Sequence, residues 1–158
     1  MRTIVVVCAA AVAIGASGCG ATTRTTTLQT PAFPTLTSAT ATFVSRDHGK
    51  DADSALTVQL LRNNAELGAE IRTVGTKFDD NASSGPLAFS VAGPFTKNDI
   101  DDGELRLRLT PDGDDDWTFD LHLTMRFSDG STRNFMWRGV RLDHTNPERV
   151  LTLDPART

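Results

Sequence analysis

Three aspartate-rich loops are the part of this sequence best suited to bind a ligand. They lie at residues 47–53, 78–81 and 112–116, each between segments expected to be strands. Carboxylates crowded into one loop repel each other unless solvent or a cation neutralises them, and Ca2+ takes about six to eight oxygen ligands. The sequence therefore predicts a Ca2+ site composed from several loops. Its candidate ligands are Asp51, Asp53, Asp79, Asp80, Asp112, Asp114 and Asp116.

The same aspartates also have a purely structural interpretation. The chain holds 16 Asp against 4 Glu, and the short Asp side chain favours turns as well as calcium loops. The helix–loop–helix calcium signature fails, because counting from Asp112 puts Trp117 at the position that requires glycine. Solvated turns and a multi-loop Ca2+ site both remain open.

No set of residues predicts catalysis. The serines carry no nucleophile motif, and His48, His122 and His144 are scattered with no close pairing. The same scatter argues against a zinc site. We therefore expect no enzymatic activity, with a hydrolase as the remaining alternative.

The clearest structural pattern is the strict alternation of residues 117–127. Trp117, Phe119 and Leu121 begin an apolar series that alternates with polar residues, which is typical of a half-buried strand. Asp129-Gly130 then predicts a hairpin turn in which both residues have positive φ. The returning strand changes phase at Gly139, which predicts a β-bulge.

Other segments repeat this period of two. Strong candidates are residues 56–60 and 105–109, and weaker ones are 41–45, 68–74, 87–92 and 149–153. The Gly-Pro pairs at 85–86 and 93–94 and the polar cluster at 98–103 are expected to be loops, and no segment has convincing helical periodicity. The prediction is an all-β protein, an antiparallel β-sandwich of about eight strands over residues 39–155.

The N-terminus has the pattern of an export signal. Arg2 is followed by an apolar run to Ala16, too short to span a membrane, and small residues lead into Cys19. This pattern resembles a bacterial lipoprotein signal. The resemblance implies cleavage after residue 18, a diacylglycerol group on Cys19, and a location in the bacterial cell envelope, anchored to a membrane and facing outside the cytoplasm. Cys8 leaves with the signal, so no intramolecular disulfide is expected.

Residues 19–38 are expected to be a disordered tether. They are rich in threonine, include Pro31 and Pro34, and hold few large apolar side chains. Removing residues 1–18 takes away Arg2 and changes the net charge from −4 to −5. A negative charge argues against nucleic acid as a partner and against simple electrostatic adhesion to anionic lipid.

The domain also resembles the PLAT family of calcium- and lipid-binding β-sandwiches. The similar segments are residues 53–60, the strand 105–109 followed by residues 112–117, and Phe135-Met136-Trp137. Gly85-Pro86 stands where the family has an acidic residue. The resemblance implies a binding module for lipid or protein, with Asp53, Asp112 and Asp114 as the best candidate cation ligands.

Together these features predict a membrane-anchored lipoprotein with a non-catalytic binding module. Its ligand is expected to be an envelope protein, a lipid or a glycan, bound with or without Ca2+. The alternative is an accessory envelope lipoprotein that docks a protein partner through a sheet face or edge without metal.

Overall fold

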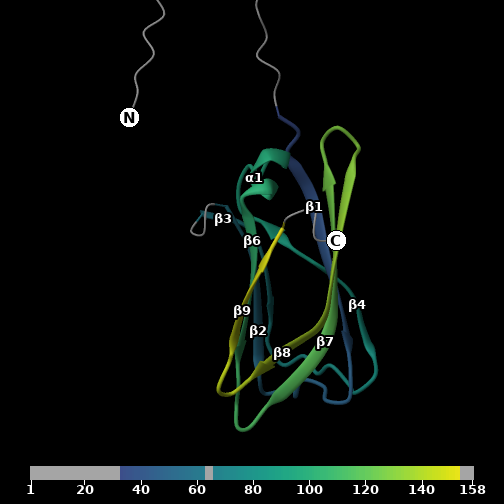
Figure 1. The fold of residues 1–158 in the computed structure, drawn as a ribbon, viewed down its shortest axis with the longest axis vertical. Coiled ribbons are helices and arrows are strands. Elements are labelled where there is room, and N and C mark those ends of the chain that lie inside the picture. Colours follow the sequence, from purple (N-terminus) through teal and green to yellow (C-terminus); the bar gives the residue numbers. More distant parts are fainter. Residues whose placement is uncertain (1–32, 63–65, 154–158) are drawn as a thin grey trace, which may run out of the picture. The chain divides into compact units, whose positions relative to one another are not determined.

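Two antiparallel β-sheets face each other in the computed structural model, which describes residues 33–62 and 66–153 (Figure 1). The first sheet has the order β4-β1-β7-β8, and the second has the order β5-β3-β2-β6-β9. The strands of the first sheet are β1 (Leu36–Ser45), β4 (Ser83–Ala88), β7 (Asp116–Phe127) and β8 (Thr132–Asp143). Those of the second are β2 (Ala55–Arg62), β3 (Glu66–Thr73), β5 (Ser90–Val91), β6 (Gly103–Thr110) and β9 (Glu148–Thr152). This confirms the predicted all-β sandwich, with nine strands among the described residues.

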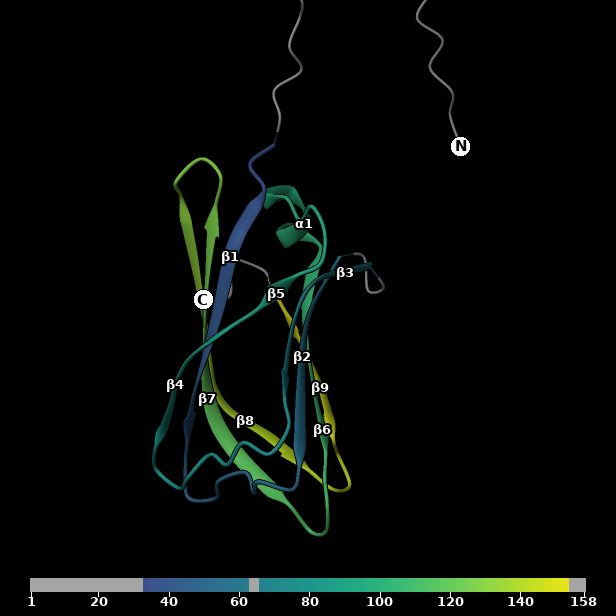
Figure 2. The same cartoon turned by 180° about the vertical axis from the view of Figure 1, so that it is seen from behind.

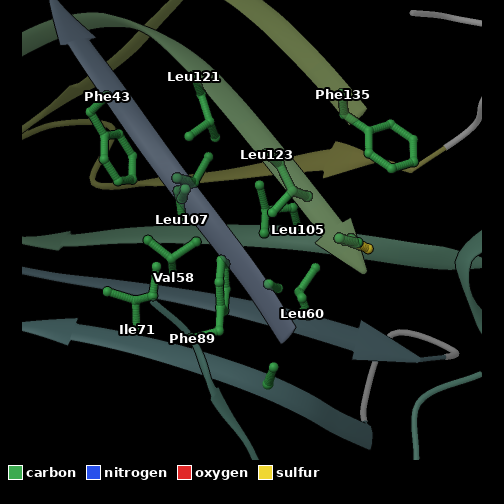
Figure 3. Close-up of a cluster of buried hydrophobic side chains, with 14 of the residues drawn as sticks. Phe43, Val58, Leu60, Ile71, Phe89, Leu105, Leu107, Leu121, Leu123 and Phe135 are labelled. Atoms are coloured by element: carbon green, nitrogen blue, oxygen red, sulfur yellow. The ribbon is translucent and has the colours of Figure 1, made fainter. Parts of the chain in front are cut away.

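The core consists of the inward-facing residues of both sheets. Every second residue of β7, beginning with Trp117, is buried, as the alternation predicts. Figure 3 shows Leu121 and Leu123 of β7 lying near Leu105 and Leu107 of β6, so side chains from the two sheets meet between them. Fully burying one such side chain contributes about 1.5–3 kcal/mol to the free energy of unfolding. Burial on one face of the central strands therefore sets their register in both sheets.

The β7–β8 hairpin confirms the bulge and corrects the turn. Gly139 has a φ of 62°, and the pairing of β7 with β8 shifts register between Phe119 and Leu121, beside it. At the turn, however, only Gly130 has positive φ (80°), whereas Asp129 does not. The turn is wider than a two-residue hairpin loop, with Gly130 donating its N–H to the Phe127 carbonyl (2.9 Å). Asp129 instead uses its carboxylate to accept from the N–H and hydroxyl of Ser131.

Two segments predicted as loops have regular structure. Gly85-Pro86 lies in β4, where Pro86 pairs with Thr42, and proline is tolerated there because β4 is an edge strand. The segment 98–103 overlaps α1 (Lys97–Asp101), whose capping box joins Thr96 and Asp99. A five-residue helix is too short to produce a helical hydrophobic period, so this prediction was wrong.

The chain enters the sandwich at one end and carries the acidic loops at the other. β1 begins at Leu36, three residues before the expected domain start at residue 39, and Leu36 is buried. In Figure 1 the start of β1 is at the top, and the loops that follow β1 and β6 are at the bottom. The predicted signal peptide (residues 1–18), Cys19 and the tether up to residue 32 lie outside the described residues. None of the helical structure described in the chain is long and apolar enough to cross a membrane.

Candidate functional site

The three acidic loops come together at one end of the sandwich. The first joins β1 to β2, the second joins β3 to β4, and the third joins β6 to β7. They surround an open hollow of about 420 Å³. It is lined by His48, Gly49, Asp51, Asp80, Asp112, Asp114, Asp115 and Asp116. We call this surface the acidic end.

Most of the predicted metal ligands lie at the acidic end, but they do not share one position. Asp51, Asp80, Asp112, Asp114 and Asp116 line the hollow, together with Asp115, which the sequence analysis did not name. Asp79 lines a neighbouring hollow of about 410 Å³ with Lys77, and Asp53 lines neither of the two.

Backbone and side-chain hydrogen bonds join the first loop to the other two. Lys50 and Phe78 exchange two backbone hydrogen bonds of 2.9 Å, and the Gly49 N–H donates to Asp80 Oδ1 at 2.6 Å. Ser54 connects to the third loop, because its hydroxyl donates to Asp115 and accepts from the Asp112 N–H. The loops therefore form one connected surface.

A lysine ammonium lies beneath this surface. Lys50 is fully buried, and its Nζ donates to the carbonyls of Asp51 (2.7 Å) and Ser54. The Phe78 ring is 5.6 Å away. Burial lowers the pKa of Lys50, although the carboxylates of Asp115, Asp53 and Asp51 act in the opposite direction. An internal cation thus partly neutralises the acidic loops.

Sequence reasoning missed the role of Lys50. The available signal was a single lysine within an otherwise acidic loop. Its burial depends on the two-residue bridge to Phe78, which joins segments far apart in the chain.

Asp115 is the most enclosed carboxylate of the hollow. It is 9% exposed and accepts a hydrogen bond from the Ser54 hydroxyl. Burial raises the pKa of Asp115, and the nearby charges of Asp51 and Asp53 raise it further, against the effect of Lys50. The position of Asp115 next to Asp51 therefore favours the protonated form of the Asp115 carboxyl.

Some of the remaining aspartates at the acidic end form ion pairs, and others have open carboxylates, meaning carboxylates without a side-chain partner. Asp116 forms a two-point ion pair with Arg141, at 2.8 and 2.7 Å. Lys77 lies 2.9 Å from Asp79. By contrast, Asp112 and Asp114 have no hydrogen-bond or ion-pair partner for their side chains in the described part of the chain. The open carboxylates of the hollow are those best placed to meet a ligand.

The donor chemistry suits Ca2+, but the arrangement does not converge on one ion. Within residues 33–62 and 66–153, no three histidine, aspartate or glutamate side chains are grouped closely enough to hold a metal. A calcium site would require the open carboxylates to move towards each other. Calcium binding therefore stays a prediction.

An aromatic cluster supports the acidic end from below. Trp117 is fully buried, and its ring centroid is 5.1 Å from that of Phe78 in a stacked arrangement. Its Nε1 donates to Ser45 Oγ at 2.9 Å. Trp117 directly follows the third loop and packs on Phe78 of the second loop. Its fluorescence should therefore report changes in these loops.

The three histidines lie on three different segments, and the His144 N–H donates to the carbonyl of Asp115, which lines the acidic hollow (3.2 Å). His48 lines the acidic hollow, His122 is exposed on the outer face of β7, and His144 lies in the turn after β8.

Comparison with family models and with curated proteins gives no match for this chain.

Proposed function

We propose that this protein is an exported, lipid-anchored lipoprotein whose non-catalytic β-sandwich binds a cationic ligand at its acidic end. The observation that carries the proposal is the convergence of three acidic loops around one open hollow. Lys50 and Arg141 offset only part of the negative charge there. A surface with excess negative charge attracts cations from solution. Ca2+ is the simplest cation to test, and a cationic group on a partner is the next.

The acidic end lies at the opposite end of the sandwich from the start of β1. β1 has ten residues, so its two ends are about 30 Å apart at roughly 3.3 Å per residue. If Cys19 carries the lipid, the tether joins the sandwich at the start of β1 and the acidic end lies beyond its other end.

A calcium titration of the full chain tests the acidic end. At about 100 times its dissociation constant, a ligand that binds only the folded state adds about 2.7 kcal/mol to the free energy of unfolding, which raises the melting temperature by roughly 10 °C. We expect a saturable shift in melting temperature and Trp117 fluorescence that a chelator reverses. The double variant Asp112→Asn/Asp114→Asn should lose it.

The matched control removes the same charge from the other end of the sandwich, as Asp102→Asn/Glu104→Gln, and should keep the shift. No shift at millimolar Ca2+ would exclude calcium. The same titration with spermidine then tests an organic cation. If neither cation binds, the proposal for the acidic end is wrong.

The anchor is tested separately. Two acyl chains, at about 0.8 kcal/mol per buried methylene, are enough for stable membrane attachment. Cys19→Ser should therefore move the protein from the membrane fraction to the soluble fraction. A variant that still sediments with membranes would show that Cys19 is not the anchor.

A further inference from the structure

The two long sides of the sandwich differ in the described part of the chain: the chain crosses one side from sheet to sheet, and the other side ends in two strand edges. The chain passes from β4 in the first sheet to β5 in the second through the single residue Phe89, and Figure 2 shows this crossing on one side of the sandwich. On the opposite side β8 is the last strand of one sheet and β9 is the last strand of the other. No described segment pairs with the outer edge of either strand.

Between these two edges lies a partly apolar slot of about 380 Å³, lined by Trp137, Val150, Leu151 and Thr152. Trp137 stacks on Phe135, with ring centroids 5.8 Å apart and an interplanar angle of 8°. Val150 is 45% exposed, and Met136 on the outer face of β8 is 41% exposed. Large apolar side chains therefore lie both within the slot and beside it.

Of the four edge strands, β8 is the best suited to accept another strand. β4 contains Gly85-Pro86, and β5 is only two residues long, so both edges are poor templates. β9 has five residues, whereas β8 has twelve and no proline. Its segment before the Gly139 bulge is a continuous edge that includes Trp137.

The charged residues of β8 indicate what kind of partner strand its edge could bind. Before its last residue, β8 carries only arginines as charged side chains, namely Arg133, Arg138 and Arg141. Two antiparallel copies of β8 would place arginines near arginines, which opposes self-association. Arg138 forms no ion pair within 4 Å among the described residues, although its charge helps to lower the pKa of Asp120, so its exposed guanidinium can still meet a carboxylate from outside.

We propose that the free edge of β8 binds an extended segment of a partner protein in which apolar and acidic residues alternate. The segment would add a fifth strand to the first sheet, with backbone hydrogen bonds along β8. Alternate side chains of a strand point to opposite faces. Its apolar side chains would enter the slot beside Trp137, and its acidic side chains would lie on the outer face near Arg138.

Selection of random nine-residue peptides on the full chain tests this proposal. We expect the selected peptides to alternate apolar and acidic residues and to change the fluorescence of Trp137. Trp137→Phe should remove that fluorescence change, since Trp117 is fully buried elsewhere. Arg138→Glu should weaken the binding of acidic peptides about tenfold, as for an exposed charge that faces an opposite charge.

The matched control is Arg108→Glu, an exposed arginine on β6 of the other sheet, which should leave peptide binding unchanged. Selected peptides that are basic, or that bind Arg138→Glu and the parent chain equally, would overturn the proposal. So would a selection that yields no binding peptide. Asp112→Asn/Asp114→Asn should bind the same peptides, which separates this surface from the acidic end.

Discussion

Gly49 is the position where a single methyl group should test how the acidic end is built. A Cβ at residue 49 would overlap the Phe78 carbonyl oxygen and lie 3.0 Å from both the Asp79 carbonyl carbon and Asp80 Oδ1. Two of these three atoms belong to the backbone, so a side-chain rotation cannot relieve the overlap. Gly49→Ala should therefore push the first acidic loop away from the second.

The size of the effect follows from the contacts that would be lost. Separation of the loops breaks the two 2.9 Å hydrogen bonds between Lys50 and Phe78 and the 2.6 Å bond from Gly49 to Asp80. At about 0.5–1.5 kcal/mol each, these give a destabilisation of about 2–4 kcal/mol. For a domain of this size that corresponds to a fall in melting temperature of roughly 8–16 °C.

Thermal unfolding followed by circular dichroism and by tryptophan fluorescence measures this fall. Gly93→Ala is the matched control, because a Cβ there meets no atom within 4 Å and Gly93 does not have positive φ. If Gly49→Ala melts within about 1 °C of Gly93→Ala, the close contact between the first two loops does not exist in solution, and the described acidic end is wrong.

Three further predictions concern stability. Lys50→Met keeps the length of the side chain but leaves the Asp51 and Ser54 carbonyls without their donor. Urea denaturation at pH 7 should therefore show a free energy of unfolding that is lower by about 2–4 kcal/mol. Equal or greater stability would contradict the role of the ammonium. Burial raises the pKa of Asp99, but hydrogen bonds from Thr96 and Arg62 outweigh it and lower the pKa overall, so its stabilisation is present above about pH 4 and is lost as the pH falls through the lowered value. Asp99→Asn should therefore cost about 1 kcal/mol at pH 7 and flatten the decline in stability below pH 4, and an unchanged acid profile would refute this. Gly139→Ala should cost about 1 kcal/mol, because its φ of 62° is unfavourable for a residue with a Cβ while the space around it is open; a cost near zero would contradict the bulge geometry.

The sequence predicted the fold well where one face of a strand is buried. The alternation in β7 follows directly from a sheet with one face in the core, and Gly139 marked the bulge because the phase of the apolar residues changed there. Local chemistry that depends on tertiary position was not predicted. Pro86 looks like a loop residue until its strand is known to be at an edge, and α1 is stabilised by one capping box and the burial of Ile100.

In the candidate site, too, some features could be predicted from the sequence and others could not. A two-sheet sandwich brings loops from different parts of the sequence to one end, so the meeting of the three acidic loops could be anticipated from strand order. What could not be anticipated is which carboxylates are already paired. The ion pair between Asp116 and Arg141 joins residues on β7 and β8 whose positions are set by the register of the hairpin.

The buried ammonium changes what kind of cation binding the acidic end can support. A chelating calcium loop depends on the ion to hold its carboxylates together, whereas here Lys50 and backbone hydrogen bonds hold the loops. If a cation binds there, we expect the open carboxylates, Asp112 and Asp114, to attract it chiefly through the field of the whole surface. Such binding is screened by salt, since the Debye length falls from about 30 Å at 0.01 M to about 10 Å at 0.1 M. A cation affinity that drops steeply across this range would indicate binding to the surface field, while an affinity that holds at high salt would indicate that the carboxylates close around the ion.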